Sequence, residues 1–119
     1  MSASAQADLQ SRLGSVRDRF VAILDERLDA LEVLRDALEQ EETRVSALED
    51  IRFIVHKIAG TAGTLGFEHV GTLAARTETR IDECLEQCAG ASHWDSAAAD
   101  LDDFMEVASQ VALAHTPAA

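Results

Sequence analysis

Apolar residues recur every three or four positions through most of the chain, which is the spacing of one buried stripe on a helix. Four such stripes cover residues 9–38, 51–65, 70–88 and 94–111. No segment alternates apolar and polar residues with the Val, Ile and Thr enrichment of a strand. The pattern predicts an all-α protein, an antiparallel four-helix bundle whose amphipathic helices are joined by short turns.

The first stripe is longer than a compact bundle of this size needs. Gly14 followed by Ser15 resembles a cap that restarts a helix. We therefore expect a break at this point and a short additional N-terminal helix at one end of the bundle. One continuous bent helix is the alternative.

Capping and turn residues set the other predicted boundaries. Ser46 with Glu49 forms a capping box, which predicts the start of the second bundle helix. Gly66 is expected to close that helix. Ser92 with Asp95 is expected to cap the last helix after the turn CAGAS.

The length of 119 residues is that of one domain, residues 1–119, with residues 1–8 and 116–119 expected to fray. Lys and Arg number 10 against 22 Asp and Glu, which gives a net charge of −12. Such a charge repels phosphate backbones and anionic membranes, so neither nucleic acid nor membrane is an expected partner. No long apolar run or signal peptide is visible, and the expected location is the cytoplasm.

The two cysteines, Cys84 and Cys88, lie one helical turn apart. In a reducing compartment they are most simply thiols on one helix face. A zinc site would have to recruit histidine from elsewhere in the chain, so no metal site is predicted.

One helix face carries an unusual set of residues. A rotation of about 100° per residue places Phe53, His56, Gly60, Gly63 and Phe67 together, opposite the second apolar stripe. Each glycine inside a helix costs about 1 kcal/mol relative to alanine. Two glycines beside a histidine leave a bare backbone that another molecule can approach closely.

This face suits a phosphoryl carrier. Neutral imidazole is a nucleophile near pH 7, and an exposed histidine can accept a phosphoryl group on nitrogen and pass it to a carboxylate. Residues 51–67 include Arg52 and Lys57 and no acid, which predicts a locally cationic site. Phe53 is expected either to anchor a partner or to tuck under the first helix as core.

The segment HKIAGTAGTLGF resembles the pattern of histidine-containing phosphotransfer (HPt) domains of multistep two-component relays. That pattern is a histidine, a glycine four residues later, small residues and a closing Leu-Gly, here His56, Gly60, Leu65 and Gly66. The resemblance implies a four-helix bundle, and it extends over nearly the full length. The family's lysine three residues after the histidine is replaced by Ala59, and the nearby lysine is Lys57.

The resemblance implies that His56 is the phosphoacceptor. From the charges of the segment itself we expect Lys57 to screen the phosphate charge, helped by Arg52. The resemblance implies receiver domains and a hybrid sensor histidine kinase as partners, no bound cofactor, and magnesium held by the receiver. The surface expected to meet the partner consists of Arg52, Phe53, Gly60, Gly63 and Phe67.

Two other function classes share features with this sequence. A nucleotide-binding enzyme is suggested by GTAGTLG, but no strand precedes it, and neither a Gly-Lys-Ser/Thr ending nor Gly-x-Gly-x-x-Gly spacing is present. An interaction module that binds a receiver or kinase without carrying phosphate uses the same face and stays open. The remaining polar residues, Arg76, Arg80, His69, His93 and His115, are expected to be structural or solvated, although the two arginines could flank the histidine.

Overall fold

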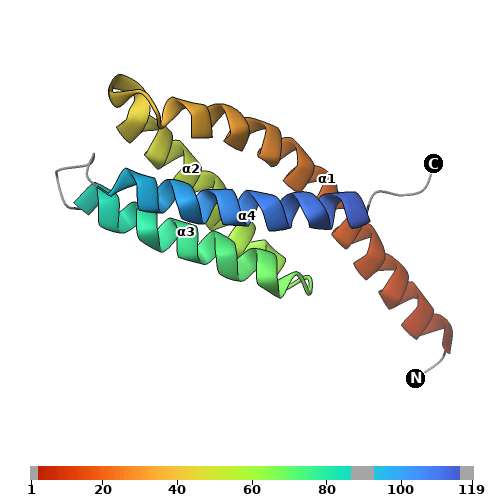
Figure 1. Cartoon of the computed structure of the whole chain (residues 1–119). Helices are drawn as coiled ribbons and strands as arrows, with labels where there is room; N and C mark the ends of the chain where they lie inside the picture. Colours follow the sequence, from red (N-terminus) through yellow and green to blue (C-terminus); the bar gives the residue numbers. More distant parts are fainter. Residues whose placement is uncertain (1–2, 87–92, 116–119) are drawn as a thin grey trace.

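The computed structural model describes residues 3–86 and 93–115. It contains four helices, α1 (Ala3–Ala37), α2 (Glu41–Ala62), α3 (Glu68–Glu86) and α4 (Trp94–Ala114), and no strand in the described residues (Figure 1). Each helix packs against the next, and α4 packs back on α1. The all-α four-helix bundle predicted from periodicity is therefore confirmed. No helix in the described part of the chain is both long and apolar enough to span a bilayer.

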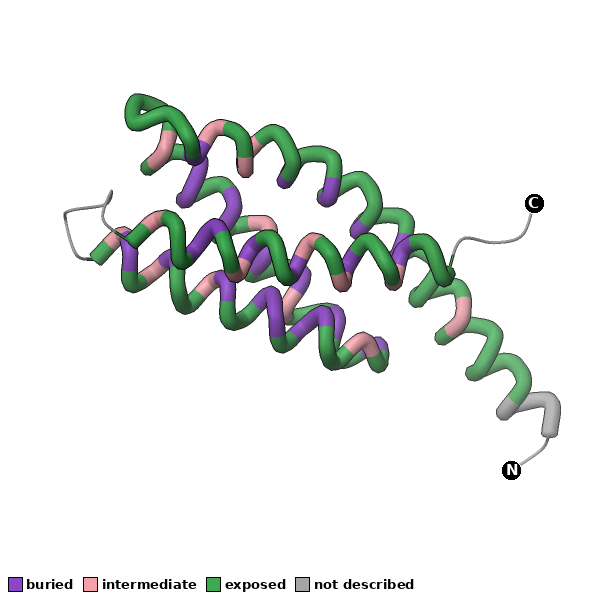
Figure 2. Tube along the Cα trace, in the orientation of Figure 1, coloured by how far each residue is buried: buried purple, intermediate pink, exposed green. Residues whose placement is uncertain are grey.

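The core is built from the predicted stripes (Figure 2), except that Leu9, Leu13, Val16 and Ile23 of the first stripe are exposed. Thr77 is its one buried polar residue in the described chain, and its hydroxyl donates to the Leu73 carbonyl at 2.8 Å, so no hydrogen-bonding group is left unpaired there. The largest fully buried side chains come from all four helices: Leu24, Leu31, Ile51, Val55, Ile81, Leu101 and Phe104.

Helix α1 does not break at Gly14, and the expected separate N-terminal helix is absent from the described residues. A single glycine costs a helix only about 1 kcal/mol, and no proline follows it here to stop the helix. The helix already starts at Ala3, inside the stretch expected to fray. Its first part projects beyond the other helices and extends the molecule to 59 Å in its longest dimension (Figure 1).

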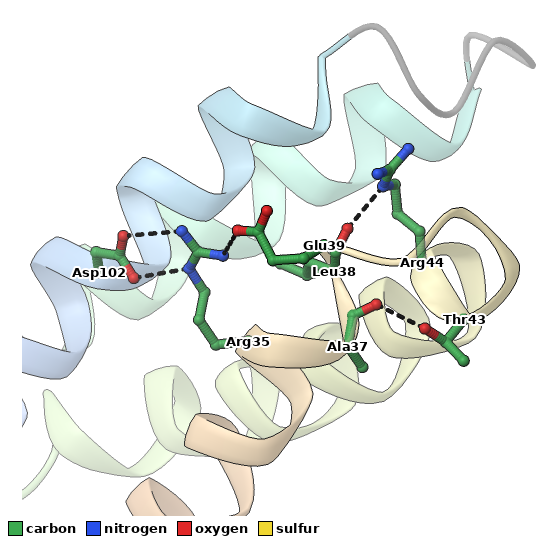
Figure 3. Close-up of polar contacts among 7 residues, drawn as sticks. All are labelled: Arg35, Ala37, Leu38, Glu39, Thr43, Arg44 and Asp102. Carbon is green, nitrogen blue, oxygen red and sulfur yellow. Dashed lines mark hydrogen bonds and ion pairs between the residues drawn. The ribbon is translucent and has the colours of Figure 1, made fainter.

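The turn between α1 and α2 is fixed by side chains that bind the carbonyl of the last residue of α1 and that of the residue after it (Figure 3). Thr43 Oγ1 donates to the Ala37 carbonyl at 2.7 Å, and Arg44 Nε donates to the Leu38 carbonyl at 2.7 Å. Carbonyls at a helix end lack the partner that a further helical turn would supply, so these side chains satisfy them, together with the Gln40 N–H, which donates to the Ala37 carbonyl at 3.4 Å. Arg35 adds a bridge to Asp102 of α4 at 2.9 Å, and this hydrogen bond raises the pKa of the Arg35 guanidinium.

The capping box predicted at Ser46 is wrong, because α2 begins five residues earlier, at Glu41. Glu41 and Glu42 occupy its first turn, where a negative charge is favoured by the helix dipole. The guanidinium of Arg44 also lies 4.5 Å from the centre of the Trp94 ring, which fixes this end of α2 against α4. Tertiary contacts therefore determine this boundary.

At the start of α4 the N-cap residue is His93, which makes no side-chain capping bond. The predicted cap Ser92, the turn CAGAS and Cys88 lie outside the described residues. Cys84 is buried, and its Sγ donates to the His93 carbonyl at 3.0 Å, which joins α3 to α4. Burial raises the pKa of the Cys84 thiol, although Arg80 opposes the shift.

Candidate functional site

The imidazole of His56 projects outward from α2 beside a carboxylate of α3. Its side chain is 70% exposed, and its Nδ1 lies 2.6 Å from Oε2 of Glu78, whose own side chain is only 21% exposed. The nucleophile expected from the sequence is therefore open to solvent on one side and held on the other. Glu78 was not predicted.

The contact with Glu78 determines which imidazole nitrogen is free. An ionised carboxylate only accepts hydrogen bonds, so at 2.6 Å the proton of a neutral His56 ring belongs on Nδ1. The lone pair of the neutral ring is then on Nε2. This nitrogen is the atom that an incoming electrophile can reach.

The expectation of a locally cationic site is wrong in three dimensions. Arg52 forms an ion pair with Asp82 of α3, and Glu78 adds a carboxylate directly at the His56 ring. Residues 51–67 carry no acid, but the neighbouring helix α3 supplies carboxylates to this face. Arg52 is thus engaged by a carboxylate in the described structure.

Lys57 and Phe53 lie together beside the histidine. Phe53 is 63% exposed, which excludes the alternative that it packs in the core. The Nζ of Lys57 lies 4.4 Å from the centre of the Phe53 ring, within the range of a cation–π contact. A surface hollow is lined by Glu49, Arg52, Phe53, His56 and Glu78.

Gly60 of α2 and Gly63, the residue that caps the end of α2, leave open space. A Cβ built on Gly60 or on Gly63 would meet no heavy atom within 4 Å, and both residues are exposed. A shallow groove beside them is lined by small residues of α2 and α3, including Ala59, Gly63, Gly71 and Ala75. Ala59 lies where the family commonly has a lysine, so this surface lacks the positive charge that such a lysine would supply.

Phe67 does not belong to this face, contrary to the prediction. The helix ends before it: the Phe67 N–H donates to the Ala62 carbonyl at 2.8 Å, and Gly66 takes φ of +89°. The helix itself ends at Ala62 with Gly63 as its C-cap, and the left-handed Gly66 closes the turn that follows, so the rotation of 100° per residue no longer applies beyond Gly66. Phe67 stacks on Phe20 of α1 with ring centres 5.4 Å apart.

Two further residues at the site were not found from the sequence. Gly71 of α3 faces α2 so closely that a Cβ there would lie 3.3 Å from the backbone nitrogen of Gly63. The sequence signal that could have identified Gly71 was its position next to Val70, at the edge of the third apolar stripe. Arg17 of α1 donates from Nε to the Leu65 carbonyl at 2.9 Å and so secures the end of the histidine helix.

The remaining polar candidates lie elsewhere. Arg80 binds Asp100 of α4 at 3.1 Å and also lies 3.7 Å from Glu83, so it faces away from the histidine site. His69 and His93 are exposed. His115 packs edge-on against Phe67, with ring centres 5.1 Å apart.

Comparison with known protein families gives a match to the family model Hpt domain over residues 15–111. The chain belongs to the Hpt domain family. No curated protein and no solved structure matches the chain in the same comparisons. Hpt domains are phosphocarriers of two-component signalling rather than enzymes, and they generally interact with receiver domains and kinases. The matched region includes all of α2 and α3, and hence both His56 and Glu78.

Proposed function

We propose that this Hpt domain carries a phosphoryl group on His56, which it accepts from the aspartate of one receiver domain and donates to that of another. The observation that carries the proposal is the exposed ring whose Nδ1 is held at 2.6 Å by Glu78, which leaves Nε2 free. Membership of the family supports the same reaction class.

The proposed step is an in-line displacement. The Nε2 lone pair of His56 attacks the phosphorus of an aspartyl phosphate, the N–P bond forms, the P–O bond to the aspartate breaks, and the aspartate leaves as a carboxylate. The ring keeps its proton on Nδ1 and gains positive charge. Glu78 stabilises that charge, as a buried carboxylate does for an imidazolium. Donation to the second receiver is the same displacement in reverse.

The surroundings of His56 support the approach of a receiver. Gly60 and Gly63 leave room above the helix, and Phe53 offers an exposed aromatic contact. We assign screening of the phosphate to Lys57, which must then move from the Phe53 ring towards the phosphoryl oxygens. We expect no cofactor on this chain, and we expect the receiver to bring the magnesium.

Incubation of the whole chain with a phosphorylated receiver tests the proposal. We expect transfer of label to this chain in an acid-labile, base-stable form, which is the behaviour of phosphohistidine. ATP alone should give neither binding nor label, and tight ATP binding would favour a nucleotide enzyme instead. Binding of the receiver without transfer would show an interaction module.

The open space at Gly60 gives a separate prediction. Gly60→Ala should raise the free energy of unfolding by about 1 kcal/mol, on the order of 4 °C in Tm, because the helix gains and nothing clashes. It should also slow transfer, because the added methyl group stands where the receiver approaches. Thermal unfolding and transfer kinetics measure the two effects.

The matched control is Gly71→Ala, the same substitution on α3. There the new Cβ lies 3.3 Å from backbone nitrogen, which cannot swing aside, so Tm should fall below that of Gly60→Ala. A lower Tm with normal transfer in Gly60→Ala would mean that Gly60 serves packing and not access.

A further inference from the structure

Two contacts between α2 and α3 lie next to each other at the candidate site. Arg52 of α2 forms an ion pair with Asp82 of α3, and His56 of α2 contacts Glu78 of α3. Arg52 precedes His56 by four residues, and Asp82 follows Glu78 by four residues. This spacing is that of two antiparallel helices whose paired residues are one helical turn apart, so the ion pair is the direct neighbour of the histidine contact.

Arg52 is also part of the hollow that His56 lines. Of the described residues that line this hollow, Arg52 is the one cation. A long or aromatic side chain on a helix lies over the turn that precedes it, which places the His56 ring towards the turn of Arg52. Lys57 lines the groove towards α1 instead, and it contacts the Phe53 ring. Arg52 therefore already lies beside the histidine, whereas Lys57 must first move.

The ion pair between Arg52 and Asp82 is open to water. The Arg52 side chain is 50% exposed and that of Asp82 is 40% exposed. An exposed pair of this kind changes an equilibrium constant by no more than about fivefold. Water and a competing anion can therefore separate the two side chains at little cost.

A phosphoryl group is a stronger ligand for a guanidinium than one carboxylate is. It carries a charge of about −1.5 to −2 at pH 7 and has three acceptor oxygens. The planar guanidinium of arginine can donate two parallel hydrogen bonds to such a group. A phosphoryl group on His56, one turn from Arg52, therefore competes with Asp82 for the same cation.

We propose that Arg52 exchanges partners when His56 is phosphorylated: it binds Asp82 in the unphosphorylated domain and the phosphoryl oxygens in the phosphorylated one. This exchange rests on the phosphoryl transfer proposed for His56. Arg52 then stabilises the phosphorylated form, whereas Asp82 stabilises the unphosphorylated form by holding Arg52. Asp82 is thus a positioning residue that acts through Arg52, and it sets how strongly this domain retains a phosphoryl group relative to a receiver.

The equilibrium of phosphoryl transfer between a receiver and the full chain tests the exchange. Arg52→Gln removes the cation and should lower the equilibrium constant for phosphorylated His56 by about fivefold. Asp82→Asn releases Arg52 and should raise the same constant by about threefold. Both variants break one ion pair, so a merely structural pair would move the constant in the same direction in both, and that result would overturn the proposal.

A control is needed for the loss of negative charge, because removing any carboxylate near His56 lessens its repulsion of the phosphoryl group. Glu49→Gln serves this purpose, since Glu49 lines the same hollow and forms no ion pair within the described residues. It should raise the constant less than Asp82→Asn does. In the Arg52→Gln background, Asp82→Asn should have no larger effect than Glu49→Gln. An Asp82→Asn effect that persists in full without Arg52 contradicts the exchange.

Nitrogen NMR of the arginine Nε–H groups gives a readout without a receiver. Phosphoramidate, a small phosphoryl donor, is the probe that phosphorylates His56, and phosphorus NMR detects the phosphohistidine. We expect the Arg52 resonance to shift on phosphorylation, whereas that of Arg80, which binds Asp100, should stay in place. Phosphorylated His56 with an unchanged Arg52 resonance would rule out the exchange and leave the phosphocarrier function intact. A chain that forms no phosphohistidine with phosphoramidate or with a receiver would overturn both.

Discussion

His56→Gln should abolish the acid-labile label on this Hpt domain. Glutamine retains a polar, similarly sized side chain but offers no nucleophilic ring nitrogen, so the proposed N–P bond cannot form. The His56 side chain is 70% exposed, so the free energy of unfolding should change by no more than about 0.5 kcal/mol. Transfer from a phosphorylated receiver and thermal unfolding measure the two effects on the same sample.

The control for this variant is His69→Gln. His69 is also exposed but lies on α3, outside the hollow that His56 lines. This variant should be labelled as fast as the wild-type chain. Label that survives in His56→Gln and disappears in His69→Gln would move the phosphoacceptor to His69.

Glu78→Gln should slow phosphoryl transfer by about tenfold. A hydrogen bond to a charged group contributes about 1.5–3 kcal/mol, or roughly 10- to 100-fold, and the exposure of His56 places the effect at the lower end. Glutamine can donate as well as accept, so it no longer fixes the proton on Nδ1 and no longer offsets the charge of the phosphorylated ring. Single-turnover transfer from a receiver measures the rate.

The direction of this effect distinguishes two roles for Glu78. If the carboxylate mainly repels the incoming phosphate, Glu78→Gln accelerates transfer, and the positioning role is wrong. Glu49→Gln is the control, because Glu49 lines the same hollow without a hydrogen bond to the ring. Nitrogen NMR of His56 gives an independent readout, with Nδ1 protonated in the wild-type chain and a mixture of tautomers in Glu78→Gln.

The fold was predictable from the sequence wherever neighbouring helices cover the apolar stripe of a helix. Ile51, Val55 and Ile58 are buried as their spacing predicts. The same spacing on α1 placed Leu9 and Leu13 on an inner face, and both are exposed. Periodicity identifies an amphipathic face but does not show what covers it. The predicted boundary of α2 was wrong where side chains from its own first turns satisfy the end of α1, as Thr43 and Arg44 do.

The site was predictable only in its local part. His56, Gly60 and Gly63 share one helix, so a rotation of about 100° per residue suffices to place them on one face. Glu78 belongs to α3, and its contact with His56 depends on how far α3 is shifted along α2, which sequence spacing alone does not give. The misplacement of Phe67 has a related cause, because its position depends on the left-handed turn at Gly66.

The hydrogen bond between His56 and Glu78 spans two helices, and the closeness of those helices depends on a residue that touches neither side chain. Gly71 lets α3 approach to where a methyl group would already press on the backbone of α2. We expect a substitution there that moves α3 away from α2 to lengthen the 2.6 Å contact and to loosen the imidazole. If His56 carries the phosphoryl group as proposed, we expect its reactivity to depend on the spacing between α2 and α3.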